Sequence, residues 1–111
     1  MPKLDLPGPK ARAMIERDGK VLLWQRTREE GRMGSFWELP SVDQLPQARL
    51  GREVGSFRHT ITHHVHTVQV FRASILKPPP GYYWSARERL GEIPLSTIAR
   101  KALSVVDSIP D

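Results

Sequence analysis

The chain has 111 residues, and its 17 Lys and Arg residues against 12 Asp and Glu residues give a formal charge of +5, which favours polyanionic partners. It contains no cysteine, which excludes disulfides, iron–sulfur clusters and thiolate zinc sites from these residues. No apolar run approaches the length of a membrane span or the core of a signal peptide. We therefore expect one soluble domain with a modest core and a cytoplasmic location.

The N-terminal part of the sequence predicts a tail followed by a hairpin. Residues 1–10 are punctuated by prolines and are expected to be a linker, so the folded domain is expected to span residues 11–111. A short strand is predicted over Ala11–Glu16, and Asp18-Gly19 predicts a tight turn into an antiparallel strand over Val21–Gln25. A polar, glycine-containing loop and a short apolar segment ending at a proline follow.

The middle of the chain holds one ambiguous region and one clear strand. A short helix over Leu45–Arg52 is possible within Ser41–Gly55, although a proline and a glycine weaken this prediction. The β-branched run Val65–Ile75 predicts a long strand. Its apolar alternation slips between Val65 and Val68, which indicates a bulge there.

The C-terminal part of the sequence predicts a strand and two helical pieces. After the proline run, Tyr82–Trp84 predicts a strand and Ala86–Leu90 a single helical turn. Ser96 suits the N-cap of a final amphipathic helix that packs on the sheet. The apolar face of that helix is predicted to consist of Ile98, Ala102, Val105, Val106 and Ile109. The elements together predict an α+β fold, a mixed β-sheet sandwich with a C-terminal amphipathic helix.

The segment Phe57–His64, with the sequence FRHTITHH, is chemically the most distinctive part of the chain. We expect it to form a polar loop at the head of the long strand, held by that rigid element. Its hydroxyls and imidazoles suit hydrogen bonding to a planar polar ligand such as a base edge, or to a phosphate.

Three blocks of the sequence, in this order, resemble one family. Gly19–Pro40 ends in Trp37-Glu38-Leu39-Pro40, which looks like the glycine loop and "Trp-Glu-Phe-Pro" element of Nudix-like domains. Phe57–His63 resembles the "His-x-Phe-Ser-His" signature in the C-terminal domain of MutY-type adenine DNA glycosylases. Tyr83–Lys101 is similar to the tryptophan and leucine-proline helix that closes that domain.

The resemblance implies a Nudix-like fold and a role in base-excision repair. Members of this glycosylase family remove adenine mispaired with 8-oxoguanine. Their N-terminal domain carries the catalytic carboxylate and a four-iron four-sulfur cluster, and their C-terminal Nudix-like domain verifies the oxidised guanine. The chain is then expected to be the recognition domain, with no catalytic residue, metal or cofactor of its own. Its expected partners are duplex DNA with an 8-oxoguanine:adenine or guanine:adenine pair and the N-terminal catalytic domain of the same polypeptide. We expect a monomer, working at the bacterial nucleoid.

The resemblance also assigns DNA- and lesion-binding residues, which are Arg58, His59, Ile61, Thr62 and His63. Thr62 falls where the family places a serine that hydrogen-bonds 8-oxoguanine, and threonine keeps that hydroxyl. Ile61 replaces the usual phenylalanine and loses its aromatic stacking. His63 is expected to reach toward DNA, and His59 is expected to be structural.

A catalytic Nudix pyrophosphohydrolase acting on oxidised nucleotides is the main alternative. Such enzymes cluster glutamates on one helix to hold magnesium at the diphosphate. The segment between Pro40 and Gly55 is shorter than that motif, and it offers only Asp43 and Glu53 as carboxylates. A degenerate Nudix fold that acts as a protein-docking module is a third possibility.

Several other patterns have ordinary structural interpretations. The four histidines lack cysteine and an obvious third ligand for zinc, so solvated or core-capping roles are favoured. Hydroxyls beside these histidines lack an acidic neighbour that would orient a nucleophile–base pair. Trp24 and Trp37 are assigned to the core and Trp84 to the edge of the sheet, in preference to base stacking. Arg100 and Lys101 are expected to point outward as solvated charges.

Overall fold

A computed structural model describes residues 11–25 and 36–108, with the backbone alone described for Ile61. The predicted linker over residues 1–10 therefore lies outside the described residues. The elements follow the order β1 (Arg12–Arg17), β2 (Lys20–Gln25), β3 (Trp37–Glu38), η2 (Val42–Gln44), β4 (Arg49–Ile61), β5 (His64–Ser74), β6 (Tyr82–Ala86), η3 (Arg87–Glu92) and α1 (Thr97–Asp107). No helix in these ranges is long and apolar enough to cross a bilayer.

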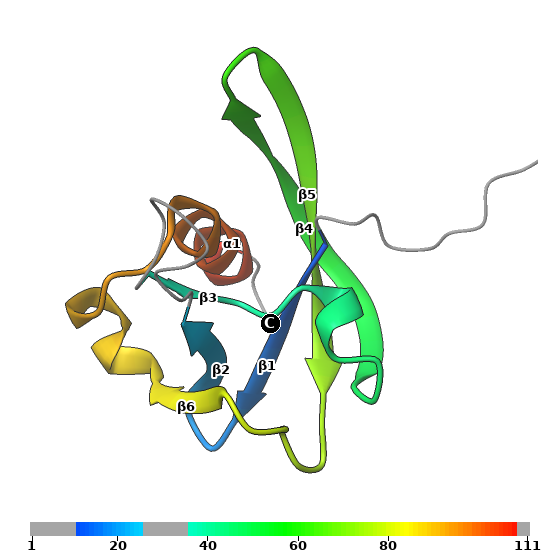
Figure 1. Cartoon of the computed structure of the whole chain (residues 1–111), viewed down its shortest axis with the longest axis vertical. Coiled ribbons are helices and arrows are strands. Elements are labelled where there is room, and N and C mark those ends of the chain that lie inside the picture. The colour runs from blue at the N-terminus through cyan, green and yellow to red at the C-terminus, as the bar shows by residue number, and fades with distance from the viewer. Residues whose placement is uncertain (1–10, 26–35, 109–111) are drawn as a thin grey trace, which may run out of the picture.

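The strands form one mixed, six-stranded sheet. The order of pairing is β3-β2-β1-β5-β4, and β6 pairs with β2 off this path. β1 runs parallel to β5, whereas the other pairs are antiparallel. Helix α1 packs on one face of the sheet, and the β4–β5 hairpin extends well beyond the other elements (Figure 1). The predicted α+β architecture is confirmed.

The first hairpin forms at the predicted residues. Asp18 and Gly19 both have positive φ angles, 53° and 76°, which is the conformation of a two-residue turn that matches strand twist. Glu16 and Arg17 pair with Val21 and Lys20 on either side of it. The turn dipeptide therefore fixes the register of β1 on β2.

The short helix predicted over Leu45–Arg52 is wrong. The chain forms only the 3-10 helix η2 and then enters β4 at Arg49. Pro46 cannot donate a backbone hydrogen bond, and Gly51 lies so close to β5 that a Cβ atom there would be 3.0 Å from the carbonyl oxygen of Arg72. Pairing with β5 therefore overrides the local helical tendency.

The predicted bulge is on the wrong strand. Pairing between β4 and β5 is regular from Gly55 to Ile61, which includes the partners of Val65 and Val68. The register instead shifts on β4, between Leu50 and Glu53 and between Glu53 and Gly55. The change in apolar pattern along β5 reflects the end of the core: Val68 is buried, whereas Val65 is 61% exposed.

The core occupies both faces of the sheet. The cluster under α1 contains Met14, Val21, Leu23, Leu39, Val70, Leu90, Leu95, Ala99, Ala102, Leu103 and Val106. The cluster on the opposite face contains Ala13, Ile15, Leu22, Leu45 and Ile75, with Trp84 packed against it. Successive β2 residues alternate between the two clusters, as strand geometry requires.

Helix α1 begins after Ser96, as predicted, but its buried face differs slightly from the prediction. Ala99, Ala102, Leu103 and Val106 are buried, whereas Ile98 and Val105 are half-buried and Ile109 lies outside the described residues. The packed stripe is rotated by about one residue, because the side chains at 99, 102, 103 and 106 follow the helical spacing of a core-facing surface.

Candidate nucleic-acid interface

The distinctive segment Phe57–His64 is a β-hairpin, which corrects the prediction of a polar loop. β4 continues to Ile61 and β5 begins at His64, so only Thr62 and His63 form the connecting turn. The cross-strand pairs Arg58 with Thr67, His59 with His66, Thr60 with Val65 and Ile61 with His64 use the backbone groups that a loop would leave free. The end of this hairpin, residues 58–67, is named the hairpin tip (Figure 1).

Thr62 occupies the first position of the turn and is exposed. Its φ angle is 55°, a left-handed conformation that β-branched residues rarely adopt. Such a conformation typically costs on the order of 1–3 kcal/mol and is common at functional sites. Thr62 is therefore an exposed residue at the end of two paired strands, which restrict its position.

One face of the hairpin tip carries three histidines. His59 pairs directly with His66, and His64 lies two residues away on the same side of β5. The rings of His64 and His66 have centroids 6.4 Å apart. Towards the body of the protein this face continues into Phe57 and the buried Val68. The half-buried His59 thus extends the core outward, whereas His63 is exposed in the turn.

The opposite face of the hairpin tip carries Arg58, Thr60, Val65 and Thr67, all exposed. The five residues assigned by resemblance are therefore brought together at the tip but do not share one surface. Arg58 and His59 lie on opposite faces, and Thr62 and His63 lie in the turn between them. A ligand that contacts the end of the hairpin would reach the turn residues first.

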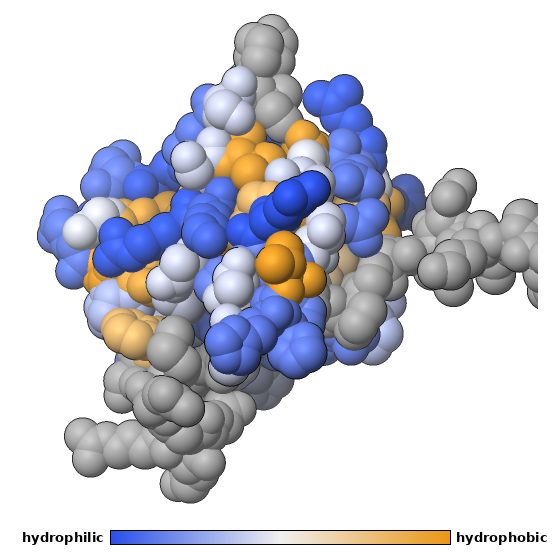
Figure 2. Space-filling view, turned by 90° about the horizontal axis from the view of Figure 1, so that it is seen from above, coloured by the Kyte–Doolittle hydropathy of each residue, from blue (hydrophilic) through white to orange (hydrophobic). Residues whose placement is uncertain are grey.

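The charge at the hairpin tip favours an anion. The sequence contains no Asp or Glu between Glu53 and Glu88, and this interval includes both strands of the tip. Lys101 on α1 is half-buried, and its Nζ lies 3.3 Å from the carbonyl oxygen of Arg58. This contact corrects the expectation that Lys101 is merely solvated. Viewed along the hairpin, the surface is mostly hydrophilic with isolated hydrophobic patches (Figure 2).

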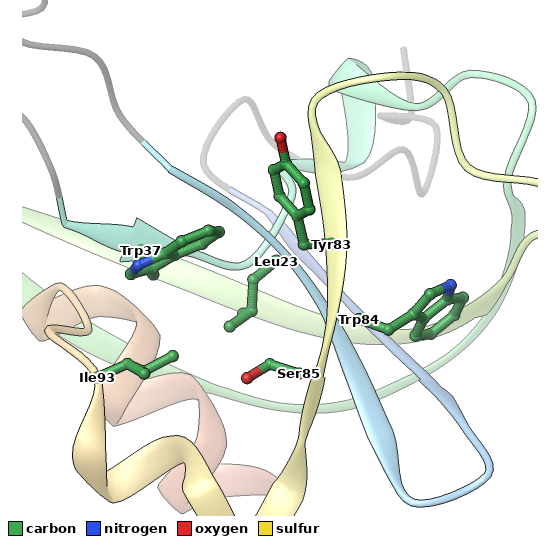
Figure 3. Close-up of a pocket in the computed structure, with 6 residues that line it drawn as sticks. All are labelled: Leu23, Trp37, Tyr83, Trp84, Ser85 and Ile93. Atoms are coloured by element: carbon green, nitrogen blue, oxygen red, sulfur yellow. The ribbon is translucent and has the colours of Figure 1, made fainter.

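A second candidate site is a shallow apolar pocket beside β6, lined by Leu23, Trp37, Tyr83, Trp84, Ser85 and Ile93. Its volume is about 230 Å³, which is below the roughly 300 Å³ at which small-molecule sites begin. Tyr83 is 58% exposed and stands edge-to-face on Trp37 at 5.7 Å between centroids. The side chain of Trp84 points away from the others (Figure 3), towards the second core cluster. The pocket is therefore too small for a nucleotide.

The predicted positions of the tryptophans, in the core or at the edge of the sheet, are confirmed in part. Trp24 is half-buried and its indole Nε1 donates a hydrogen bond to the carbonyl of Leu39 at 3.3 Å. Trp37 packs against the core under α1. Trp84 is on the edge strand β6, as predicted, but it also packs inward and carries the guanidinium of Arg17 over its ring.

The segment in which a Nudix hydrolase would place its glutamate helix has a different structure here. Asp43 lies in η2 and accepts a hydrogen bond from the hydroxyl of Ser41, whereas Glu53 lies on β4 and accepts one from Gln69. Within the described ranges, no group of three or more His, Cys, Asp or Glu side chains is placed to hold a metal ion. The acids of this segment are engaged locally and lie on separate elements.

Glu38 is a buried carboxylate that sequence reasoning did not single out. It is 2% exposed, and its Oε1 accepts a hydrogen bond of 2.6 Å from the hydroxyl of Ser96. The same hydroxyl accepts a bond of 3.1 Å from the backbone N–H of Ala99 and so caps α1. A carboxylate near the N-terminus of a helix is favoured by the helix dipole. Glu38 therefore joins β3 to the start of α1 and has a structural role.

The architecture is similar to that of several solved structures. No curated protein sequence matches the chain. Among solved structures, the C-terminal domain of mouse MUTYH, crystallised with human PCNA, shares 23% identity over 87% of this chain and 85% of that one, with a TM-score of 0.67. A NUDIX hydrolase from Nitrosomonas europaea shares 10% identity over 88% and 86%, with a TM-score of 0.71. A MutT NUDIX hydrolase from Burkholderia pseudomallei shares 21% over 86% and 95%, with a TM-score of 0.66.

These structural similarities show a shared fold, and they confirm the Nudix-like architecture inferred from the three sequence blocks. The profile of the NUDIX domain matches residues 11–105, which is nearly the whole chain. The chain belongs to the NUDIX domain family.

Proposed function

We propose that this chain is the 8-oxoguanine recognition domain of an adenine DNA glycosylase and is itself non-catalytic. The observation that carries the proposal is Thr62, an exposed hydroxyl residue in a strained turn at the end of a projecting hairpin whose tip has no acidic residue. The fold shared with the C-terminal domain of mouse MUTYH supports the same assignment.

The chemistry of the lesion suits such a hydroxyl. Oxidation of guanine converts N7 from an acceptor into a donor and adds a carbonyl at C8. A side chain that both donates and accepts hydrogen bonds can therefore match the oxidised edge, and threonine has this capacity. A good contact to a base edge supplies roughly 1–3 kcal/mol of discrimination. Thr62 is the turn residue with a hydroxyl, and His63 beside it can add a second polar contact.

The remaining parts of the proposal concern the parent enzyme. The glycosylase would contribute an N-terminal domain with the catalytic carboxylate and the four-iron four-sulfur cluster, since this chain has no cysteine. The basic residues around the hairpin tip would contact DNA phosphates and contribute affinity without sequence preference. We propose a monomer and a cytoplasmic location.

The test is a titration of the ¹⁵N-labelled chain with two short duplexes that differ only in 8-oxoguanine or guanine opposite adenine. We expect the amide resonances of residues 58–67 to shift, with tighter binding to the oxidised duplex. Thr62→Val should reduce that preference by about fivefold or more, because it removes the hydroxyl and keeps the shape. Thr67→Val, on the same hairpin, is the matched control. An unchanged preference in Thr62→Val would refute the assigned role.

The hydrolase alternative is tested in parallel. The chain is incubated with 8-oxo-dGTP and Mg²⁺, and pyrophosphate release is measured. We expect no release above the rate without protein, because Asp43 and Glu53 lie on separate elements and are bonded to Ser41 and Gln69. Pyrophosphate release that depends on magnesium and on Glu53 would refute the proposal that the chain is non-catalytic.

A further inference from the structure

The end of the sheet farthest from the hairpin tip contains a second cleft. It has a volume of about 500 Å³ and is lined by Arg17, Gln47, Arg49, Ser74, Ile75 and Leu76. These residues lie at the end of β1, at or just before the start of β4, and at or just after the end of β5, which meet at the same end of the molecule (Figure 1). The cleft is thus separated from the hairpin tip by the length of β5.

Arg17 is held in place by three contacts. Its two terminal nitrogens donate to the carbonyl oxygens of Leu76, at 3.3 Å, and of Ile75. Its guanidinium carbon lies 4.9 Å from the centroid of the Trp84 ring. These contacts use only part of the donor capacity of a guanidinium, which has five N–H groups. A restrained guanidinium loses less entropy when it binds a ligand.

The positive charge in this cleft is not neutralised within the described residues. The nearby Glu16 is bonded to Arg72 at 2.8 Å and to Arg87 at 2.9 Å, so both of its oxygens are engaged. Across residues 11–25 and 36–108, neither Arg17 nor Arg49 pairs with a carboxylate. The two guanidiniums that line one cleft therefore attract an anion.

The rest of the lining indicates which anion fits. The hydroxyl of Ser74 and the amide of Gln47 offer further hydrogen bonds. Leu76 is 96% exposed at the rim, next to the buried Ile75. A ligand that fits both the guanidiniums and the exposed Leu76 therefore carries an apolar group beside its negative charge. The phosphates of duplex DNA have no such group, whereas an acidic peptide with a leucine does.

We propose that this cleft binds an acidic-hydrophobic segment of a partner protein, with a carboxylate on Arg17 and Arg49 and an apolar side chain against Leu76. Carboxylate–guanidinium hydrogen bonds are strong and directional, which gives the cleft its selectivity for the acidic group. Arg49 and Leu76 are exposed, so the affinity is modest and sensitive to salt. The proposal is independent of lesion recognition at the hairpin tip.

The test uses the ¹⁵N-labelled full chain and the peptide acetyl-Ser-Leu-Asp-Glu-Leu-Ser-amide. We expect its binding to shift the backbone amides of Ser74, Leu76 and Arg49, and not those of the hairpin tip. The same peptide with Asn and Gln in place of its acids should bind about fivefold to tenfold more weakly. Equal binding of the acidic and amide peptides would overturn the proposal.

Variants locate the site on the protein. Arg49→Gln should weaken the acidic peptide by about fivefold, whereas Arg52→Gln removes the same charge outside the cleft and should change little. Arg17→Lys, checked for folding by its spectrum, should also weaken the peptide because lysine lacks the planar fork. An unchanged affinity in Arg49→Gln would overturn the proposal. It would also be overturned if duplex DNA or inorganic phosphate shifted the amide resonances of the cleft residues at a lower concentration than the peptide requires.

Discussion

The two halves of the β4–β5 hairpin differ in burial and in backbone strain. The half near the sheet packs under α1: Val70 is fully buried, and a Cβ atom at Gly55 would lie 2.6 Å from Cγ1 of Val105. No described helix covers the turn of the hairpin tip, which exposes most of its side chains and holds Thr62 in a strained conformation. Burial stabilises the first half. That stability offsets the free-energy cost of the strained turn in the second half.

This contrast has a simple lesson for the site. A strained residue persists only when its surroundings determine its conformation. The regular pairing from Gly55 to Ile61 does this for Thr62, because each pair restricts the next. Changes in the packed half should therefore alter global stability strongly, whereas changes in the tip should alter it little or even increase it.

The largest effect is expected where α1 joins the sheet. Ser96→Ala removes the cap on Ala99 and the hydrogen bond to the buried Glu38. We expect a loss of about 3 kcal/mol in the free energy of unfolding, since a cap and a partner of a buried carboxylate are lost together. Urea unfolding measures this, with Ser104→Ala, at an exposed site on the same helix, as the control. A loss equal to that of the control would contradict the structural role of Glu38.

An intermediate effect is expected where α1 crosses β4. Gly55→Ala places a methyl group against Val105, and we expect a loss of about 2 kcal/mol from overpacking. Gly91→Ala is the matched control, because a Cβ atom there meets nothing within 4 Å. Thermal unfolding of the two variants gives the comparison. Equal melting temperatures would mean that α1 does not approach β4 as closely as described.

The smallest effect is expected at the turn, and its sign is opposite. Thr62→Asn replaces a β-branched residue by one that tolerates positive φ, and we expect a gain of up to about 1 kcal/mol in the free energy of unfolding. Thr60→Asn, on the neighbouring strand, should give no gain, because asparagine is a poor strand residue. A loss of stability in Thr62→Asn would show that the turn is not strained.

The parts of the fold that could be predicted are those with strong local signals. Asp18-Gly19 has the composition of a two-residue hairpin turn, and Ser96 has the side chain of an N-cap. The start of β4 has no such signal, because a glycine and two arginines become a strand only by pairing with β5. Strand formation there depends on tertiary contacts, which the local sequence does not contain.

The candidate sites divide in the same way. The residues of the hairpin tip could be named from their resemblance to a known signature, but their division between two faces depends on a turn at Thr62. Threonine is not a typical residue for positive φ, so nothing in the local sequence indicated a two-residue turn there. Arg17 and Arg49 line the same cleft although they are far apart in the chain, and nothing in their local sequence indicates this.

The position of β4 has a consequence for behaviour at high protein concentration. β4 is the outermost strand on its side of the sheet, and such strands can recruit another molecule into an extended aggregate. Two register shifts interrupt its pairing, and Arg49, Arg52 and Arg58 place like charges along it. Irregular geometry and repulsion are both known safeguards against fibre formation. The arginines of β4 thus disfavour the addition of a second copy of the chain at this edge.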